Sequence, residues 1–497
     1  MNLLCALLFV LLAATAYAAE PVWIEGSTEP LLQLTGEKAQ YQAHGKSTAP
    51  RTRNATLTAL GLAGSDLGVP VAFPSKIVLV FGDSWGFRQD GERRWVWTPG
   101  WGKDDSMAYF DRPVDFGACR TITDFDRKLS TQNEPVEPDY SSAPELKFFV
   151  KPDPGAPFPR FAPTRIANLR PGQGLGEFEV PTGAFALDDK LYVFYNVKHQ
   201  QQTEPGGKRT VYFLNSILAR ADGPSAAWTA SSPPLLKRLY DVSEHPALAD
   251  VHAPPDDTRG PGKFIHVAPV VLDAPALGKI GIRERLPEPL RNSERLVFMW
   301  GSSWKYVRSD LYLAVVDAKD IDAIIDGERD ASKWWYCSGI DGGNPAWTHD
   351  ETAAAPLIGN WSPSAEPCLG EHSVVWNPVL GRFLLAYQEQ YTSIRMRTAA
   401  APWGPWSAPV RVFGKGDPLA LKFIRHEGKN TITNNPVETF RPDGKPFLVP
   451  DKHGATYGPY LFEECTRGSD GRVNLYFTMS CWNPYQVFLM KTSFKVE

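Results

Sequence analysis

The hydrophobic positions along the chain come in short runs that are separated by polar turns, and long amphipathic periods are scarce. The runs are rich in Val, Leu, Phe and Tyr, whereas the best helical stretch, Asp317 to Asp330, is short. The chain holds 44 Pro and 41 Gly, which supply residues for turns. This pattern is typical of an all-β sandwich, barrel or propeller.

A loose repeat narrows the choice among these architectures. Each copy has a first apolar strand, a turn, a second strand rich in large apolar residues, and then a third strand. The first strands read DLGVPVAF, VPTGAFAL, IHVAPVVL, GEHSVVW and YGPYLFEE. The second strands read KIVLVFGDSW, KLYVFYNVKH, RLVFMWGSSW, GRFLLAYQEQ and RVNLYFTMSCW. Five copies with long insertions predict a five-bladed β-propeller, and a β-sandwich with coincidental hairpins is the alternative.

The residues between first and second strands support these hairpins. Residues 187–190 (LDDK), 377–381 (NPVLG) and 468–471 (GSDG) each join one first strand to its second strand. Asp, Asn, Pro and Gly favour tight turns because of their backbone preferences and short polar side chains. The turns therefore agree with the strand assignment.

The polar residues of the repeat gather at one end of each hairpin. In a propeller the first strand lines a central channel and the second strand returns to the same face, so its end should meet the start of the first. These positions predict one polar and aromatic mouth, which consists of Asp66, Asp83, Trp85, Thr182, Asn196, His266, Trp304, Glu371, His372, Gln388, Tyr457, Trp482 and Asn483. The opposite strand ends hold mostly turn residues, so this mouth is the predicted functional site.

Asp66 and Asp83 belong to one predicted hairpin. Its first strand runs from Asp66 to Phe73, and its second returns from Ile77 to Asp83, which places the two carboxylates near each other. A pair of carboxylates can divide the roles of acid and base when their surroundings separate their pKa values. Glycosidases need such a pair, and Trp and Tyr offer flat faces for sugar rings. The alternative for each aspartate alone is a turn or capping residue.

Several motifs resemble a known propeller family. Gly64–Gly68 (GSDLG) and Phe81–Trp85 (FGDSW) resemble the paired GTDLG and FGDT-type motifs of a family long classed as a domain of unknown function. The entry to its fourth blade and its last blade are similar to residues 370–374, 398–406, 457–460 and 480–487. The resemblance extends from about Leu34 to the C-terminus. Ser65 departs from the usual Thr, and residues 88–105 form a long insertion near the mouth.

Characterised members of that family are endo-D-arabinanases, which are glycoside hydrolases. The resemblance implies a hydrolase of a furanoside polysaccharide, with Asp66 and Asp83 as the catalytic pair and inversion at the anomeric carbon. Inversion needs a carboxyl separation of roughly 6.5–9.5 Å, whereas retention needs about 5–5.5 Å. By analogy with related propeller glycosidases, Asp66 would be the base and Asp83 the acid. Glu371 would tune the pair or bind a sugar hydroxyl.

The other mouth residues would bind the substrate, and the resemblance implies no required cofactor. A structural calcium ion is compatible with it, since related propellers hold one in some cases. Two other functions stay open: a non-catalytic carbohydrate-binding propeller, and a metal-dependent hydrolase or lyase that uses Asp66, Asp83, His266 and His372. The scattered positions of these four residues give the metal-dependent function no support from spacing.

Charge and the N-terminal segment bear on partners and location. The formal net charge is −4 and no Lys/Arg-rich run occurs, so neither a nucleic acid nor an anionic membrane is an expected partner. Residues 1–19 resemble a signal peptide, and their apolar run is short for a membrane anchor. We therefore expect an exported protein, extracellular or periplasmic, with one catalytic propeller over residues 20–497 that acts as a monomer.

Cysteine pairing is left open by the sequence. Five cysteines remain after the predicted leader is removed, so at least one thiol has no partner. Proximity alone suggests the pairs Cys337–Cys368 and Cys465–Cys481. No regular spacing of Cys and His indicates a zinc site.

Overall fold

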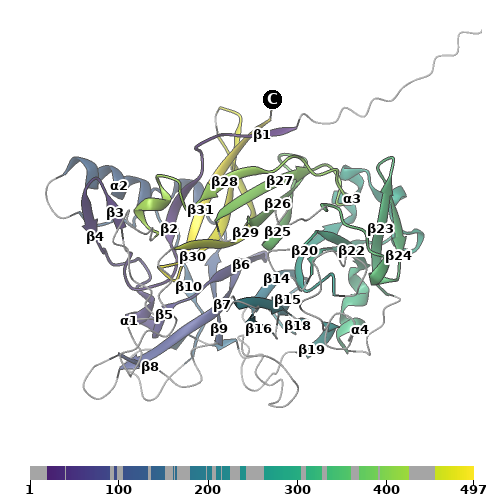
Figure 1. The fold of residues 1–497 in the computed structure, drawn as a ribbon, viewed down its shortest axis with the longest axis horizontal. Coiled ribbons are helices and arrows are strands. Elements are labelled where there is room, and N and C mark those ends of the chain that lie inside the picture. Colours follow the sequence, from purple (N-terminus) through teal and green to yellow (C-terminus); the bar gives the residue numbers. More distant parts are fainter. Residues whose placement is uncertain are drawn as a thin grey trace, which may run out of the picture.

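Antiparallel strands make up most of the regular structure in the computed structural model of the chain (Figure 1). The structure describes residues 20–39, 41–89, 95–97, 104–132, 136–151, 160–161, 163–164, 180–196, 199–203, 209–213, 215–223, 235–241, 262–303, 309–326, 333–359, 369–389, 392–424, 454–468 and 470–496. The larger sheets follow one another along the chain, and we number them blade 1 to blade 5.

Each blade corresponds to one copy of the predicted repeat. Blade 1 contains β5 (Leu62–Gly64), β6 (Leu67–Ala72), β7 (Lys76–Gln89), β8 (Trp95–Trp97), β9 (Asp104–Asp111), β10 (Lys147–Phe148) and β13 (Pro163–Thr164). Blade 2 contains β14 (Val180–Leu187), β15 (Lys190–Asn196), β18 (Asn215–Ala221) and β19 (Leu235–Asp241). Blade 3 contains β20 (His266–Asp273), β21 (Arg295–Ser302), β22 (Tyr312–Asp317), β23 (Trp335–Asp341) and β24 (Asn344–Thr348).

The last two blades complete the set. Blade 4 contains β25 (Leu369–Asn377), β26 (Arg382–Glu389), β27 (Ser393–Ala399) and β28 (Val410–Gly414). Blade 5 contains β29 (Ala455–Arg467), β30 (Arg472–Trp482), β31 (Gln486–Val496), β1 (Pro21–Trp23) and β2 (Glu29–Gln33). The prediction of an all-β, five-bladed propeller is confirmed.

The remaining elements lie between and outside the blades. The described helices are α1 (Thr56–Leu60), α2 (Thr121–Thr131), α3 (Ala274–Ile280) and α4 (Ile321–Asp326). Short 3-10 turns span Phe116–Ala118, Arg283–Arg285, Glu288–Leu290, Ala318–Asp320, Glu351–Ala353 and Ala420–Lys422. Small hairpins pair β3 (Tyr41–Ala43) with β4 (Lys46–Thr48), β11 (Val150–Lys151) with β12 (Arg160–Phe161), and β16 (His199–Thr203) with β17 (Arg209–Phe213).

The inner strands form a closed ring. Neighbours contact each other in the order β6, β14, β20, β25 and β29, and β29 then contacts β6. In Figure 1 these strands lie toward the middle of the molecule, whereas β19 and β24 lie further out. The ring explains why one end of every inner strand can contribute to a shared mouth.

The second strand of each blade is apolar along its length because both of its faces are covered. In β21, Leu296 to Trp300 are at most 1% exposed, and β15 and β26 are also buried over nearly all of their residues. A strand between two neighbouring blades meets side chains on both faces, so it does not need an alternating polar pattern. The continuous runs in the sequence are therefore the middle layers of the blades.

Local chemistry sets the hairpin turns as the sequence predicts. Asp188, with φ +55°, lies in the turn between β14 and β15. Asn377 Oδ1 accepts hydrogen bonds from the backbone N–H groups of Val379 and Leu380, at 3.0 and 2.9 Å. Gly381 then adopts φ +62°, which suits glycine. These turns bring the second strand back to the face where the first began.

One expectation is met over the described residues and another needs correction. The predicted helical stretch from 317 to 330 contains the 3-10 turn Ala318–Asp320 and α4, and its residues 327–330 lie outside the described part. Cys465 and Cys481 are both free thiols, so the suggested Cys465–Cys481 disulfide is wrong. Cys465 faces Leu475 across the ladder, six positions along β30 from Cys481, so sequence proximity misplaced the pair. Cys368 lies outside the described residues.

The N-terminal strand β1 joins the last blade as its outer strand. Pro21, Val22 and Trp23 pair with Val496, Lys495 and Phe494 of β31. The indole N–H of Trp23 donates to Thr492 Oγ1 at 2.9 Å, and its ring packs against an apolar cluster of blades 4 and 5. Both ends of the described chain therefore stabilise the same sheet.

Trp23→Ala should lower the free energy of unfolding by about 2 kcal/mol, because it removes a half-buried ring and one hydrogen bond from blade 5. Urea unfolding followed by tryptophan fluorescence measures the change. Val22→Ala is the matched control, since Val22 is 48% exposed in the same strand, and it should change stability by less than about 0.5 kcal/mol. Equal effects of the two substitutions would contradict this role of Trp23.

Candidate active site

Asp66 stands immediately before β6, where the backbone takes an unusual course. Leu67 and Gly68 both have left-handed conformations, with φ of +63° and +85°. The amide of Leu67 donates to Ser480 Oγ of blade 5 at 2.6 Å, and the Asp66 carbonyl accepts from the amide of Gly82 at 3.0 Å. A left-handed non-glycine residue costs of order 1–3 kcal/mol and persists where its surroundings fix it. The bend therefore holds Asp66 in one place.

The Asp66 carboxyl group is buried among tyrosines. Its residue is 7% exposed, and Oδ2 accepts a hydrogen bond of 3.1 Å from the Tyr457 hydroxyl. Burial raises the pKa of Asp66 to about 7, although hydrogen bonds from Tyr485 and Tyr457 oppose this rise. A Cβ at Gly82 would come within 2.5 Å of Asp66 Oδ1. Glycine at position 82 thus leaves room for the acid.

Asp83 follows Gly82 on β7 and lies close to the same tyrosines. Its side chain is half-buried, in contrast to that of Asp66. Burial raises the pKa values of Tyr457 and Tyr485 well above the ordinary value, and the charges of Asp66 and Asp83 raise both further. The two predicted aspartates are therefore brought together around one tyrosine pair.

Glu371 is the third carboxylate of this group. It is 7% exposed on β25 of blade 4, and it raises the pKa values of Tyr457 and Tyr460 beyond the effect of burial. Blades 1, 4 and 5 thus each contribute to the cluster. Since three acids surround Tyr457, ionisation of one raises the cost of ionising the others.

Buried serine hydroxyl groups link the two backbone segments that carry the aspartates. Ser65 Oγ lies 2.8 Å from Ser84 Oγ, which lies 2.7 Å from Ser106 Oγ. Ser65 also donates to the Gly82 carbonyl at 3.0 Å. These contacts join the residue before Asp66 to the residue after Asp83. Sequence reasoning quoted Ser65 and Ser84 only as parts of motifs and did not predict this link.

The aromatic residues of the mouth pack on one another. Trp85 and Trp482 both meet Tyr485 edge to face, with ring centroids 6.4 and 5.3 Å away. Trp85 is only 3% exposed, so its ring supports Tyr485. Asn483, which is 1% exposed, turns the chain after Trp482 with φ +54°. Tyr485 was missed as a site residue, although it falls within the quoted last-blade motif.

The predicted residues of blades 2 and 3 form a buried group close to His372 of blade 4. Asn196 Nδ2 lies 3.1 Å from His266 Nε2, and burial lowers the pKa of His266 to about 3, with a smaller contribution from His372. Thr182 Oγ1 accepts from the Val267 amide at 3.3 Å and therefore ties β14 to β20. His266 is thus neutral at ordinary pH.

The remaining predicted site residues are His372, Gln388 and Trp304. His372 places Nε2 3.2 Å from the Trp300 carbonyl and Nδ1 3.3 Å from the Gly370 carbonyl, and burial lowers its pKa. Gln388 is fully buried on β26. Trp304 lies outside the described residues. Within the described part, no three side chains of His, Cys, Asp or Glu converge in an arrangement that could hold a metal ion.

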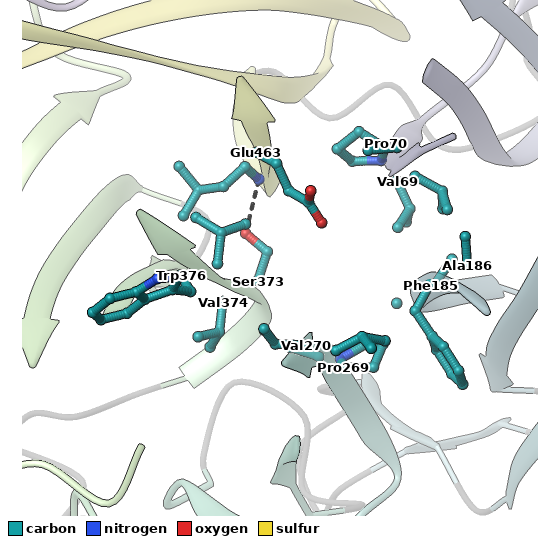
Figure 2. A pocket seen from close by; sticks show the side chains of 18 of the residues that line it. Val69, Pro70, Phe185, Ala186, Pro269, Val270, Ser373, Val374, Trp376 and Glu463 are labelled. Carbon is teal, nitrogen blue, oxygen red and sulfur yellow. Dashed lines mark hydrogen bonds between the residues drawn. The ribbon is translucent and has the colours of Figure 1, made fainter. Parts of the chain in front are cut away.

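A channel of about 570 Å³ lies between the inner strands. It extends along the halves of these strands that lie away from the mouth. Both polar and apolar groups line it, and Figure 2 shows the carboxyl group of Glu463 pointing into it from β29. The Glu463 side chain is exposed to the channel, and the protein atoms of the channel walls surround this side chain. Burial raises its pKa to about 7, with a further contribution from Glu464, which lies 3.0 Å from the Arg112 guanidinium.

Glu463→Gln should stabilise the protein above pH 7 and leave its stability unchanged near pH 4. The folded pKa exceeds the ordinary value of 4.5, so ionisation of Glu463 costs stability as pH rises from about 4.5 to 7. The gain should be on the order of 1 kcal/mol, because water in the channel screens the charge. Urea unfolding at pH 4 and pH 8 measures it. A gain of equal size at both pH values would contradict the assignment.

The fold and this site define a five-bladed propeller with a carboxylate-rich mouth. The chain belongs to the family described as a domain of unknown function, DUF4185, whose model matches residues 51–491. No curated protein matches the chain. Among the described residues, no helix is long and apolar enough to cross a membrane.

Several solved structures are distantly similar to the whole chain. A presumed hydrolase of Bacteroides ovatus has 11% sequence identity and a TM-score of 0.44, over 88% of this chain and 87% of that one. The catalytic domain of the Coprinopsis cinerea GH62 α-L-arabinofuranosidase has 10% identity and a TM-score of 0.35, over 96% and 97%. A Podospora anserina α-L-arabinofuranosidase in complex with cellotriose has 9% identity and a TM-score of 0.34, over 96% and 97%.

Proposed function

We propose that this protein is a glycoside hydrolase that cleaves a furanoside polysaccharide, with D-arabinan as the first substrate to test. The observation that supports this most is the placement of Asp66 and Asp83 around the same tyrosines, one carboxyl group buried and the other half-buried. Glycoside hydrolysis needs one carboxyl group that donates a proton and another that acts on water or the sugar. The predicted leader at residues 1–19 supports export as part of this proposal.

The two surroundings favour Asp66 as the general acid and Asp83 as the general base. A general acid must carry its proton at the working pH, and the buried carboxyl group of Asp66 does so up to about pH 7. Asp83 is the more open of the two and is better placed to activate a water molecule. This assignment reverses the one taken by analogy from related propellers. Inversion at the anomeric carbon remains part of the proposal.

Glu371 would hold the cluster's charge in balance or bind a sugar hydroxyl. Like charges disfavour each other's ionisation, so an ionised Glu371 would limit the negative charge that the cluster holds. Tyr457 and Tyr485 orient Asp66 through their hydroxyl groups. They are positioning residues in this proposal, because the proton passes from Asp66 itself to the leaving oxygen.

Asp66→Asn and Asp83→Asn should each reduce hydrolysis of D-arabinan by about two orders of magnitude or more, with the fold intact. Released oligosaccharides and reducing ends measure the rate, and L-arabinan, fructan and arabinoxylan complete the substrate panel. Asp222→Asn is the control, since Asp222 is an exposed turn residue, and it should leave the rate unchanged. Full activity in both site variants would refute the proposal.

An aryl glycoside with a good leaving group separates the two roles. Loss of the general acid matters little when the leaving group needs no proton, so Asp66→Asn should retain much more activity on this substrate than Asp83→Asn. The opposite order would restore the analogy-based assignment. Sugar binding by the wild-type protein without product from any substrate would instead favour a carbohydrate-binding propeller.

Tyr457→Phe should move the alkaline limb of the activity profile to higher pH. The Tyr457 hydroxyl stabilises ionised Asp66, so its removal raises the pKa of Asp66 and keeps the acid protonated further. The pH dependence of kcat/KM measures the shift. Tyr485→Phe should act in the same direction. Tyr140→Phe serves as the control, because the Tyr140 hydroxyl donates to the Arg51 carbonyl at 2.6 Å and not to Asp66. A shift to lower pH would contradict the hydrogen-bond assignment.

A further inference from the structure

The outer edge of blade 3 contains a groove that the candidate active site does not use. It lies between the β23–β24 hairpin and the 3-10 turns at Arg283–Arg285 and Glu288–Leu290, and it encloses about 630 Å³. In Figure 1, β23 and β24 lie at the right edge of the molecule, whereas β6, which follows Asp66, lies near the middle. We call this feature the blade 3 groove. Ligand sites have volumes of about 300–1,000 Å³.

Two tryptophans line the blade 3 groove from the same face of the hairpin. Cys337 pairs with Trp347 across the ladder, so their side chains share a face, and Trp335 shares that face because it lies two residues from Cys337. Trp335 and Trp347 are therefore diagonal neighbours, about 7–8 Å apart by the usual spacing. Both are half-buried and so keep part of their surface open. Adjacent flat faces at this spacing suit consecutive sugar rings.

The tryptophans are held rigidly. The Trp347 indole N–H donates to the Arg285 carbonyl at 3.0 Å, and its ring meets Trp403 edge to face at 6.2 Å. Trp335 lies against the His349 ring, with centroids 3.7 Å apart. Fixed side chains lose little freedom on binding, so the groove is prepared for a ligand.

The charges of the groove cancel. Glu284, Glu288, Arg285 and Arg291 all line the groove, which gives two negative and two positive groups. Within the described residues neither glutamate forms an ion pair, so both carboxylates are available to accept hydrogen bonds from hydroxyl groups. Arg285 is fixed on the Trp403 ring, with its guanidinium carbon 5.0 Å from the ring centroid. A balanced, hydroxyl-accepting surface beside flat rings favours a neutral ligand over a polyanion.

We propose that the blade 3 groove is a second carbohydrate site, which binds a neutral polysaccharide chain on Trp335 and Trp347 away from the catalytic aspartates. The choice of ligand rests on the proposed function. Among the described strands β24 is the outermost of its sheet, so a long chain can lie along this side of the blade without having to end in the groove. Such a site would keep the enzyme on its polymer between cleavage events.

The test is native electrophoresis of the full chain in gels that contain D-arabinan, L-arabinan, fructan or arabinoxylan. Asp83→Asn serves as the background so that the polymer is not degraded during the run. Adding Trp335→Ala should weaken the apparent affinity for the retarding polysaccharide about fivefold or more, because an aromatic contact is lost. Trp335→Phe keeps a ring and should retain most of the binding. Ile340→Ala, 44% exposed on the same hairpin and outside the groove, should change nothing.

The outcomes separate this proposal from the proposed reaction. Retardation that depends on Trp335, without hydrolysis by the wild-type chain, would support the groove and refute the reaction. Hydrolysis together with retardation that Trp335→Ala leaves unchanged would overturn the groove and leave the reaction standing. Equal losses in Trp335→Ala and Trp335→Phe, or no retardation by any of the four polysaccharides, would also overturn the groove.

Discussion

The contact between the first and last blades is the constraint on which the rest of the structure depends. Tyr457 and Asp66 are 391 positions apart in the sequence, yet the tyrosine hydroxyl lies 3.1 Å from the carboxylate. Beside them, Ser480 accepts from the Leu67 amide and Thr478 donates to the Gly68 carbonyl at 3.0 Å. The same contact closes the ring and sets the ionisation of the buried acid. Loss of packing between these blades would therefore disturb stability and chemistry together.

The closure also concentrates unfavourable features at the mouth. Leu67, Asn483 and Gly458 have positive φ, and Asp66 is a carboxyl group removed from water. The left-handed Leu67 and the buried carboxyl group of Asp66 cost folding free energy, and contacts across the junction of blades 1 and 5 hold both. Strain and a shifted pKa in one place are features that functional sites often combine. The well-packed middle strands offset their cost elsewhere in the ring.

The predictions from sequence were correct for features that depend on residues close together in the chain. The continuous apolar run around Val297 and the turn at Asn377 predicted strands and hairpins, because burial on two faces and side-chain capping act over a few residues. The placement of Asp66 beside the Gly82–Asp83 segment followed from the same hairpin geometry. What could not be predicted depends on contacts between distant segments. Tyr485 approaches Asp66 only because the ring closes, and β1 joins blade 5 for the same reason.

The same distinction explains the error in cysteine pairing and the open role of some predicted site residues. Cys465 and Cys481 looked adjacent because only their separation along the chain was visible, whereas the ladder register sets them apart. His266 and Thr182 have polar side chains at the starts of strands. Such a side chain can either face the mouth or link two neighbouring blades. Only the partners distinguish the two, and for Thr182 the partner is the neighbouring blade.

The pairing of β1 with β31 has a consequence for the order of events as the chain is made. The aspartates belong to the first blade, but their tyrosine partners belong to the fifth and are synthesised later. Until those residues arrive, Asp66 has neither its buried setting nor its hydrogen bonds, and the ring stays open. The surroundings of Asp66 are therefore complete only once the fifth blade has packed against the first.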